Sequence, residues 1–543
     1  MRTCTAYADD ETRATFVEGV LDALQGAGEG ADEDRPRVDD TAQAGRSWPD
    51  PTRLGSRRTD RGRIDVGAKQ TAATPAENTL AQPRLFGRWG FWMVMVGAVS
   101  ITSGLAFGYD QGVIGGALTF MQEEFGFGGF VEGLITSAVT LGALFGALLA
   151  GGLADRLSRK NVLILAGYLF IIGAIVQAIA PGVGILISGR IVIGFGVGMA
   201  SVAAPMYVAE SSSAATRGRF VSGYQLAITI GILAAQFADY VLSDSGTWRL
   251  MIGLAAVPGL VLLVVVYPVP RSPRWLVKVG RSADARDAIE KVRGPVGLDD
   301  AVDEIEQQVA SEPESTWSDL LVGGARKALV VAVGLALFQQ LTGINALIYY
   351  SDDILEEAGF TTASSQAGAS LIAVGVVNVL ATFIAIAFVD RLGRRPLLMA
   401  GMTGMFVGLV GLSLSYLYES QPDNTHSMVG SLSIIWMVVF IASFAFSLGP
   451  VVWTIISEVF PTSIRAKGMS VATAANWGAA FVLTLIFPSL MDSIGASATF
   501  AMLALMTLIA LRWTWVTVPE TKEKSLEEIA EMFELDDPMS APT

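Results

Sequence analysis

Long apolar runs alternate with short polar segments along most of the chain. About 20 apolar residues are enough to cross a bilayer, and twelve runs reach that length. They form two sets of six, at residues 89–118, 130–152, 161–180, 184–208, 219–242 and 249–269, and at residues 327–350, 368–389, 396–418, 431–457, 468–490 and 495–518. The pattern predicts an all-α polytopic membrane protein, with an N-terminal six-helix bundle over residues 85–270 and a C-terminal six-helix bundle over residues 327–518.

Residues 271–326, between the two sets, are polar. Residues 283–292 follow a Ser282 that we expect to act as a helix cap, and residues 298–309 carry acidic side chains in their first turn. Both stretches have the periodicity and the start signals of short amphipathic helices. We therefore expect an intracellular helical linker domain at residues 271–326, with a flexible linker as the alternative.

The two ends of the chain differ from the apolar region. Residues 1–84 are rich in Ala, Gly, Asp, Arg and Thr, and no apolar segment of a secretory signal follows the first basic residue. This composition predicts a disordered cytoplasmic N-terminal tail. We expect residues 519–543 to form a cytoplasmic C-terminal tail.

Basic residues gather in alternate loops, and acidic residues gather in the loops between them. The basic loops follow the second, fourth, eighth and tenth runs; they hold Arg156, Arg159, Lys160, Arg217, Arg219, Arg391, Arg394, Arg395, Arg465 and Lys467. The central segment is also rich in Arg and Lys. By the positive-inside rule, both termini and the central segment lie in the cytoplasm, and we expect a multi-pass protein of the cell (plasma) membrane.

The two halves of the chain repeat each other. An Asp-Arg-Leu-Xaa-Arg motif occurs at residues 155–159 and again at residues 390–394, after corresponding runs. An acid followed seven residues later by an arginine also occurs in both halves, as Glu210 with Arg217 and as Glu458 with Arg465. Parallel repeats of this kind are typical of alternating-access transporters, whose binding site lies between the halves near the bilayer midplane.

One charged residue, Asp110, interrupts the apolar run from residue 89 to residue 122. A carboxylate at that depth costs a few kcal/mol, and such residues usually face a cavity on an ion or substrate path. Arg190, inside the fourth run, needs an anionic partner, and Asp110 is the natural one. Breaking this pair would switch the protonation of Asp110, as a proton-coupled carrier requires. A permanent structural ion pair is the alternative.

Amide side chains form a second polar set within the runs. The set comprises Gln225, Gln339, Gln340, Asn345 and Asn378, together with Tyr349, which shares a helix face with Asn345. Amides both donate and accept hydrogen bonds, which suits the hydroxyl groups of a neutral polyhydroxylated ligand. The alternative is hydrogen bonding between helices.

Two tryptophans lie deep within runs, although tryptophan prefers the membrane interface. Trp453 follows Gly449 and Pro450, which predict a broken helix, and Trp477 stands beside Asn476. An indole face can pack against the C–H surface of a sugar ring while its N–H donates a hydrogen bond. Simple core packing is the alternative for each tryptophan.

The composition excludes several classes of protein. The 543 residues are 52% hydrophobic and 16% charged, whereas soluble proteins are about a quarter charged. The only cysteine, Cys4, and the only histidine, His426, allow no intramolecular disulfide and no cysteine or histidine metal cluster. There is no Walker lysine motif and no nucleophile paired with a base. We therefore expect no enzyme, no cofactor, no metal site and no nucleic-acid partner.

Together these features resemble the sugar porter family of the major facilitator superfamily over residues 90–530. The motifs that carry the resemblance are residues 108–116, the two Asp-Arg-Leu-Xaa-Arg loops, and residues 189–198, 205–210, 339–345, 449–453 and 519–522. The resemblance implies the major facilitator fold and import of a monosaccharide, a hexose or pentose, with a proton. It also implies contact with membrane lipid and a functional monomer.

The resemblance assigns roles to individual residues. It implies that Asp110 is the proton-coupling acid, with Arg190 as its partner. Sugar-contacting positions correspond to Gln225, Gln339, Gln340, Asn345, Asn378, Trp453 and Asn476, with Tyr349 and Trp477 lining the site. A cytoplasmic charge network, which closes the inner side of the outward-facing state, corresponds to Asp155, Arg156, Glu210, Arg217, Asp390, Arg391, Arg394, Glu458 and Arg465.

The chain departs from the family pattern after the sixth run. The family usually has Pro-Glu-Ser-Pro-Arg there, and this chain has Arg271 at the position of the acid. We expect this charge reversal to weaken the cytoplasmic network unless another acid compensates. Thr342 stands where serine is frequent, a mild change that bears on sugar preference.

Other functions stay open on the sequence alone. One is a facilitator for sugars or polyols in which Asp110 is only structural. Another is a non-transporting sugar sensor that signals through its N-terminal tail, and a membrane-embedded enzyme lacks any set of catalytic groups. The sequence does not identify the sugar, because recognition of hydroxyl stereochemistry depends on the shape of the cavity.

Overall fold

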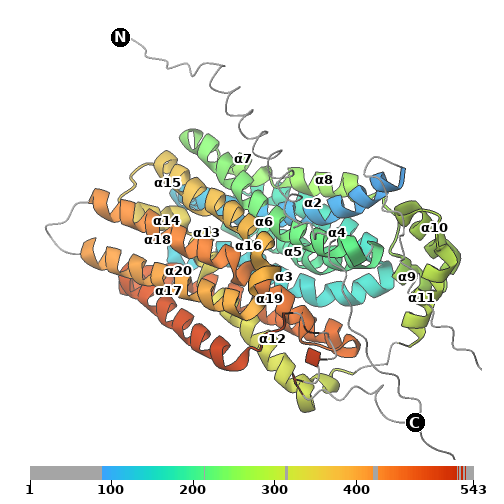
Figure 1. Ribbon diagram of the computed structural model, residues 1–543. Helices are drawn as coiled ribbons and strands as arrows, with labels where there is room; N and C mark the ends of the chain where they lie inside the picture. The colour runs from blue at the N-terminus through green and yellow to red at the C-terminus, as the bar shows by residue number, and fades with distance from the viewer. Residues whose placement is uncertain are drawn as a thin grey trace, which may run out of the picture. The chain divides into compact units, whose positions relative to one another are not determined.

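The structure is a computed structural model that describes residues 88–212, 214–311, 316–419, 426–522, 524, 528–529 and 532–533. Within these residues the regular elements are all helical (Figure 1). The predicted tail at residues 1–84 lies outside the described residues, as does most of the segment at residues 519–543.

The N-terminal half follows the first six apolar runs. Its elements are α2 (Arg88–Phe125), α3 (Gly129–Leu157), α4 (Arg159–Ala178), α5 (Val183–Ser211), α6 (Ala214–Leu242), the short 3-10 turn η1 (Ser243–Ser245), α7 (Trp248–Gly253) and α8 (Ala256–Val266). The sixth run is thus built from α7 and α8 together.

The C-terminal half follows the second six runs. Its elements are the 3-10 turn η2 (Ser318–Leu321), α12 (Gly323–Leu341), α13 (Ile344–Tyr349), α14 (Ser351–Glu357), α15 (Ala363–Ser370), the π-helical segment η3 (Leu371–Val376), α16 (Val377–Leu392), α17 (Arg394–Glu419), α18 (His426–Phe446), α19 (Leu448–Glu458) and α20 (Thr462–Thr517). The predicted helix break lies at Ser447, between α18 and α19. Pro450 has no N–H for the carbonyl of Phe446, so the helix cannot run straight through.

The described residues contain 11 helical segments that are long and apolar enough to cross a membrane. The last of them, Ile464–Thr517, has 54 residues and covers two predicted runs. Its backbone is non-helical at Gly495, where φ is 80°. This break is at the predicted start of the last run, so the segments agree with a twelve-helix major facilitator fold.

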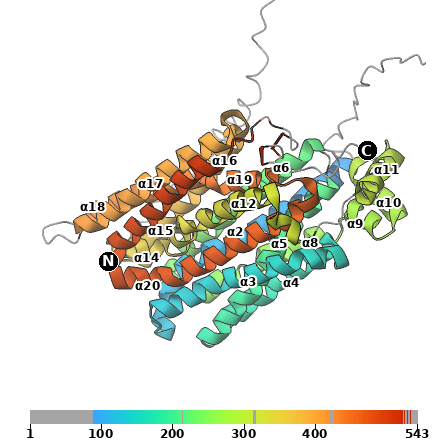
Figure 2. The same ribbon diagram turned by 90° about the horizontal axis from the view of Figure 1, so that it is seen from below.

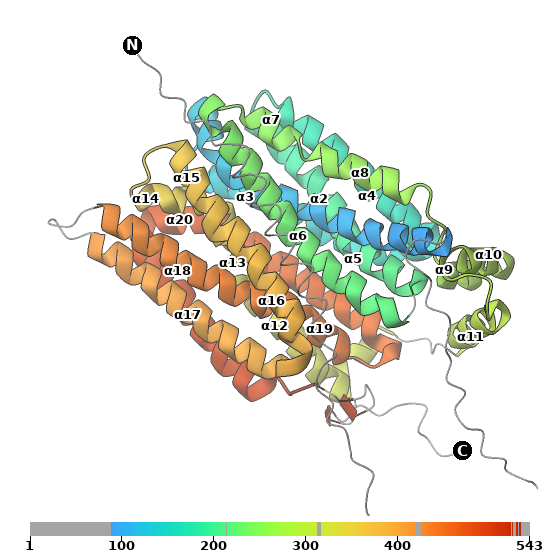
Figure 3. The ribbon, with the colours of Figure 1, turned by 45° about the horizontal axis from the view of Figure 1, so that its top comes forward.

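The linker between the halves is helical, as predicted, and consists of α9 (Pro273–Lys278), α10 (Ser282–Arg293) and α11 (Leu298–Ala310). The prediction that Ser282 caps the first long helix is wrong: Arg281 holds the cap position, and Ser282 is already helical. Its hydroxyl instead donates to Glu306 on α11, at 2.5 Å. Figure 3 shows α9, α10 and α11 at one end of the bundle, which we call the linker end, and α14 and α15 at the opposite end, the far end.

Glycines bring the helices of the N-terminal half into close contact. Gly108 of α2 lies against the backbone carbonyl of Ile228 on α6, and Gly142 of α3 lies against Gly194 of α5. A Cβ atom at any of these three glycines would collide with backbone. Small residues at such crossings allow helix backbones to approach closely, so α2 packs tightly on α6 and α3 packs tightly on α5.

The two halves meet at the far end. Helix α20 runs alongside α3 (Figure 2), and Gly133 of α3 lies directly against the carbonyl of Leu485. Gly115 of α2 faces the carbonyl of Tyr349, and Gly375 of η3 faces α6. At the linker end, the described ion pairs join residues within one half or, for Asp155 with Lys278, join the N-terminal half to linker helix α9. The structure is therefore closed at the far end, and the halves are not joined by these ion pairs at the linker end.

Candidate functional site

A buried ion pair lies in the middle of the N-terminal half. The Arg190 guanidinium on α5 donates from Nη1 to Oδ1 of Asp110 on α2, at 3.1 Å, and the two residues are 0% and 2% exposed. Arg190 also donates to the backbone carbonyls of Ile135 and Thr136 on α3, both at 3.4 Å. The contact predicted from the isolated charges is present, and three helices hold the guanidinium in place.

A chain of hydrogen-bonded amides begins one residue after the ion pair. Gln111 Nε2 donates to Asn345 Oδ1 at 2.6 Å, and Asn345 Nδ2 donates to Gln340 Oε1 at 2.8 Å. Gln340 Nε2 donates to Asn476 Oδ1 at 3.2 Å, and Asn476 Nδ2 donates to Gln339 Oε1 at 2.7 Å. The chain of amides thus runs from α2 in one half through α13 and α12 to α20 in the other half.

The structure brings four of the predicted amides together and adds one that the sequence analysis missed. Gln111 is the residue through which the N-terminal half joins the chain. Gln111 could have been found from its position, because it is the polar neighbour of Asp110 in an otherwise apolar run. It was overlooked because the intramembrane charge beside it is the stronger feature.

The helix break between α18 and α19 contributes to the same region. Gln339 Nε2 donates to the carbonyl of Leu448, the first residue of α19, at 2.8 Å. Gln225 of α6 is half-buried, and its amide nitrogen is 3.7 Å from the position of a Cβ atom added to Gly449. The break therefore lies among the predicted polar residues of α6 and α12.

The remaining predicted residues line the same part of the bundle less tightly. Tyr349 is buried at the end of α13, and Trp477 packs edge-on against Phe107 of α2 with ring centroids 5.6 Å apart. The buried side chain of Asn378 and the half-buried side chain of Trp453 make no hydrogen bond to the part of the chain that the structure describes. Core packing alone can therefore explain the position of Trp477. The side chain of Asn378 has donor and acceptor groups that no described residue uses.

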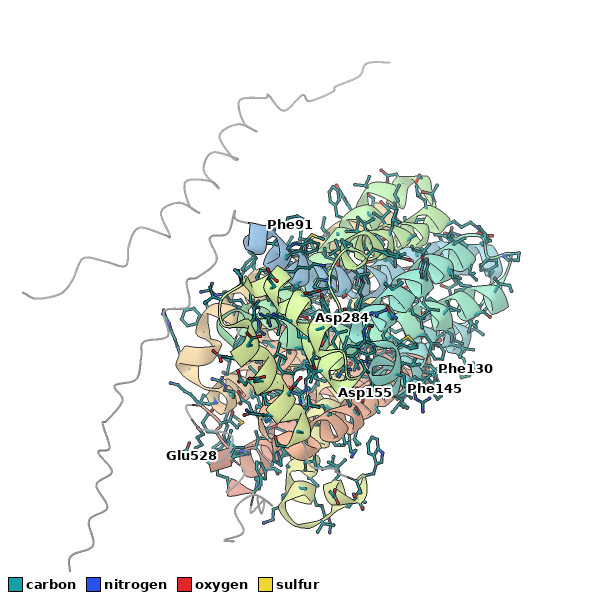
Figure 4. The ribbon with its side chains drawn as sticks, turned by 90° about the vertical axis from the view of Figure 1, so that its right-hand side faces the viewer. Phe91, Phe130, Phe145, Asp155, Asp284 and Glu528 are labelled. Carbon is teal, nitrogen blue, oxygen red and sulfur yellow. The ribbon has the colours of Figure 1, made fainter. Side chains whose placement is uncertain are left out.

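The charge network at the linker end includes a base, Arg159, that was not among the predicted members. Arg159 is buried and pairs with Asp155 and with Glu210, both at 3.0 Å, whereas Arg156 is exposed. The Ser272 hydroxyl donates to Glu210 as well. Lys278 of α9 pairs with Asp155 at 3.2 Å, and Figure 4 shows Asp155 beside the linker helices. Aligning the two repeats would have found Arg159, because it matches Arg394.

The corresponding network of the C-terminal half uses the matching residues. Arg394 pairs with Glu458 at 3.4 Å, and the hydroxyl of Thr521 donates to Glu458 at 2.6 Å. Arg465 donates from Nε to the carbonyl of Phe460 at 3.1 Å. Arg391 is exposed; the side chains of the other two predicted members, Arg217 and Asp390, lie outside the described residues.

The position of Arg271 has a counterpart in the second repeat, and the two differ in charge. Glu520 holds that position in the C-terminal half, and it accepts hydrogen bonds from the backbone N–H groups of Arg394 and Arg395, both at 3.0 Å. Arg271 cannot do this for α4 and instead lies over the ring of Trp275, 5.6 Å from its centroid. The charge reversal therefore removes an anion from the start of one helix.

Comparison with known proteins places this geometry among sugar carriers. The family described as "Sugar (and other) transporter" matches residues 96–533. The chain is similar to the metabolite transport protein YwtG of Bacillus subtilis, with 38% identity over 438 residues, 81% of this chain and 94% of that protein. It is 36% identical to the arabinose-proton symporter of Escherichia coli K12 over 444 residues, 80% of this chain and 92% of that protein.

Solved structures show the same similarity. A partially occluded inward-open structure of the xylose transporter XylE from E. coli matches with a TM-score of 0.70 and 29% identity, over 80% of this chain and 100% of that one. A structure of the proton:xylose symporter XylE bound to 6-bromo-6-deoxy-D-glucose matches with a TM-score of 0.69 and 30% identity, over 82% of this chain and 99% of that one.

Proposed function

The chain belongs to the sugar (and other) transporter family, and from this premise we propose that it imports a monosaccharide together with a proton by alternating access. The family consists of transporters, so the chain is a carrier and not an enzyme. Relatives whose names state a substrate include a D-xylose transporter, an arabinose-proton symporter and a galactose-proton symporter. A pentose or hexose is the substrate class that we assign here.

The observation that carries the proposal is the adjacency of Asp110 and Gln111 on α2. Asp110 belongs to the buried ion pair, and Gln111 begins the amide chain that crosses between the halves. A change in the charge of Asp110 would therefore act on the helix that also holds the first amide. This adjacency gives a direct physical route from proton binding to substrate binding.

The proton step uses the residues of the ion pair. A protonated Asp110 loses most of its attraction for Arg190, because the pair depends on an ionised carboxylate. Arg190 keeps its bonds to the carbonyls of Ile135 and Thr136, so α5 and α3 stay joined while α2 is released. The released α2 is then free to move with Gln111 against the C-terminal half.

The sugar step uses the amide chain. The amide side chains that form this hydrogen-bonded chain bond to one another and to backbone carbonyls. Hydroxyl groups of a sugar can replace these partners, because a hydroxyl both donates and accepts. Asn378 and Trp453 provide further contacts, the latter through its indole face. The same bonds serve as interhelical bonds when the site is empty.

We place the linker end and both termini in the cytoplasm, on the basis of the basic loops. The far end then faces outward, and the structure corresponds to a state closed to the outside. We place the protein in the cell membrane as a functional monomer surrounded by lipid. A membrane potential of 100 mV is worth about 2.3 kcal/mol per charge moved, which would drive sugar accumulation with each proton.

The test is uptake of labelled glucose, xylose and galactose into proteoliposomes, with and without an inward proton gradient. We expect gradient-driven accumulation of at least one sugar, abolished by a protonophore. Asp110→Asn should keep sugar exchange and lose accumulation, while Asp244→Asn, which changes an exposed acid of η1, should change neither. Uptake that only equilibrates would contradict coupling and leave a facilitator.

Absence of uptake would contradict transport of these three sugars. A sugar sensor is then tested by deletion of residues 1–84. A transporter should keep its uptake after this deletion, whereas a sensor should lose its output.

A further inference from the structure

Five carboxyl groups gather at the far end where the two halves meet. They are Glu132 and Asp239 from the N-terminal half and Asp352, Asp353 and Asp492 from the C-terminal half. None of them belongs to the ion pair, the amide chain or the network at the linker end. The feature that points to a ligand is the state of Asp239.

Asp239 is buried without compensation. It lies on α6 and is 2% exposed, and within the described residues neither carboxylate oxygen forms a hydrogen bond of normal geometry, although the backbone N–H of Gly116 lies nearby. Its side chain packs directly against Gly116 of α2. An ionised carboxylate in such surroundings is unfavourable, because burial removes most of its hydration and no cation among the described residues is an electrostatic neighbour that could compensate.

The charged and titratable groups around Asp239 supply no base. Asp352 faces it from α14, and Tyr109 faces it from α2. α15 and η3, which pack on α6, contain no titratable side chain. The nearest base in sequence, Arg249 of α7, is bound by Glu124 through two hydrogen bonds of 2.6 and 2.7 Å. Within the described residues, the strongest electrostatic neighbour of Asp239 is therefore another acid.

Asp352 is joined to the N-terminal half by hydrogen bonds. Gln236, one helical turn before Asp239, donates from Nε2 to the Ser370 hydroxyl at 3.2 Å. The hydroxyls of Ser370 and Ser351 are 2.6 Å apart, and Ser351 donates to Asp352 Oδ1 at 3.4 Å. Figure 3 shows α6, α14 and α15 together at the far end. These bonds hold Asp352 in place when the halves close.

Burial acts on Asp352 as well. The residue is 5% exposed and lies outside the membrane-spanning segments, and burial raises the pKa of its carboxyl to about 6. Asp353 adds a further negative group next to it, and burial raises the pKa of Asp353 too.

We propose that Asp239 and Asp352 form a second proton-binding site, separate from Asp110, which must hold a proton for the far end to close. The two carboxyls come from opposite halves, so closure brings them together and opening separates them. Two ionised carboxylates in one buried site repel, and one of them takes up a proton instead. Among the described residues these carboxyls do not come close enough to one another to form a group of three or more that could hold a metal ion. We assign a proton as the ligand because two facing carboxyls can share one.

This inference rests on the orientation given in the proposed function, in which the far end faces outward. A site that binds a proton only when closed is stabilised at low pH and is lost as the pH rises. One proton of difference changes the ratio of closed to open molecules by up to about tenfold per pH unit. External acid therefore favours the inward-facing state, in addition to its action on Asp110.

The test measures the distance across the far end by double electron–electron resonance between two spin labels. The labels are attached at Ser245→Cys and Thr361→Cys, both exposed and in opposite halves, in a full-length Cys4→Ser chain in lipid nanodiscs. Asp110→Asn is included in every sample, so that Asp110 cannot contribute to the pH response; the double variant described below separates Asp239 and Asp352 from the other acids. We expect the closed fraction to rise as the pH falls from 8 to 5.

Two variants identify the groups responsible. Asp239→Asn with Asp352→Asn should be closed at every pH, because neither side chain can ionise. Asp244→Asn should behave like the parent chain. A parent chain whose distances ignore pH, a double variant that keeps the full pH response, or a closed fraction that follows sodium at constant pH overturns the proposal. The distances need no sugar, so this outcome is independent of the uptake experiment.

Discussion

The two halves of the molecule build the same contact at the linker end with matching residues in different surroundings. Each half pairs an arginine at the start of a helix with a glutamate, Arg159 with Glu210 and Arg394 with Glu458. The N-terminal pair is the more buried, with side chains 6% and 11% exposed, against 15% and 22% in the C-terminal pair. Repetition of a motif thus preserves the pairing but not its surroundings.

The helix starts beside these pairs differ more strongly. At the start of α17, Gly393 has φ of 90° and Glu520 accepts two backbone N–H groups. At the start of α4, Ser158 has φ of 82° and its own hydroxyl accepts from the N–H of Asn161 at 3.4 Å. A left-handed backbone favours glycine, so the N-terminal half tolerates strain at Ser158 and gains a cap. The C-terminal half thus caps α17 with Glu520, which is distant in sequence, whereas the N-terminal half caps α4 with the adjacent Ser158.

The largest expected effect on the free energy of unfolding comes from substituting the two glutamates of these pairs. Glu210→Gln leaves the buried Arg159 with less negative charge and should lower the free energy of unfolding by about 2–3 kcal/mol, because a buried charge loses its compensation. Glu458→Gln should lower it by about 1 kcal/mol or less, since its partner is more exposed. Denaturant unfolding of both variants in the same detergent measures the difference. Equal losses would mean that burial does not distinguish the two pairs.

A double variant controls for the source of that loss. Glu210→Gln combined with Arg159→Gln removes the charge that the first substitution leaves buried. It should recover part of the stability lost by Glu210→Gln alone. If it unfolds more easily than either single variant, lost packing rather than uncompensated charge explains the effect.

An intermediate effect is expected from making the two helix starts alike. Arg271→Glu places an anion near the first turn of α4, where it should stabilise the fold by about 0.3–1 kcal/mol through the helix dipole. Arg271→Gln is the matched control and should give a smaller gain. The gain should shrink at high salt, which screens partly exposed charges. Thermal unfolding at low and high salt measures both, and a stability loss in Arg271→Glu would show that contact with Trp275 matters more.

The smallest expected effect is at Ser158. Ser158→Gly relaxes the backbone and removes the cap, and these changes oppose each other at about 1 kcal/mol each. The free energy of unfolding should therefore change by less than about 0.5 kcal/mol. Ser158→Ala keeps the strain, loses the cap and should be clearly less stable. A stabilised Ser158→Ala would mean that the hydroxyl does not cap α4.

The sequence predicted features that depend on strong local patterns. Charges isolated in apolar runs have few possible partners, so Asp110 and Arg190 could be paired in advance. The helix break at Ser447 followed from the missing N–H of Pro450. Ser282 was assigned wrongly because serine is a common cap, whereas the turn at Gly280, with φ of 76°, makes Arg281 the residue before the helix.

Features that depend on long-range contacts were not predicted. In the sequence, Asp352 and Asp353 resemble solvated loop acids. The packing of α14 against α15 and α18 of its own half and against α2 of the other half buries Asp352 and partly buries Asp353. Arg159 was not predicted to belong to the N-terminal network, because only the fold shows that its side chain turns inward at the start of α4. A polar residue in an apolar run can be predicted to have a buried partner, whereas the burial of an acid in a polar loop cannot be predicted from its sequence neighbours.

The close helix crossings of the N-terminal half also limit how the gene can vary. At Gly108, Gly142 and Gly194 any side chain larger than hydrogen meets backbone, so most single-base changes in these codons should be lost from a population whatever the sugar supply. At Gly151 and Gly152 an added Cβ meets nothing within 4 Å. Substitutions should accumulate there by drift, and a library of random variants should recover them in functional clones at the frequency of neutral change.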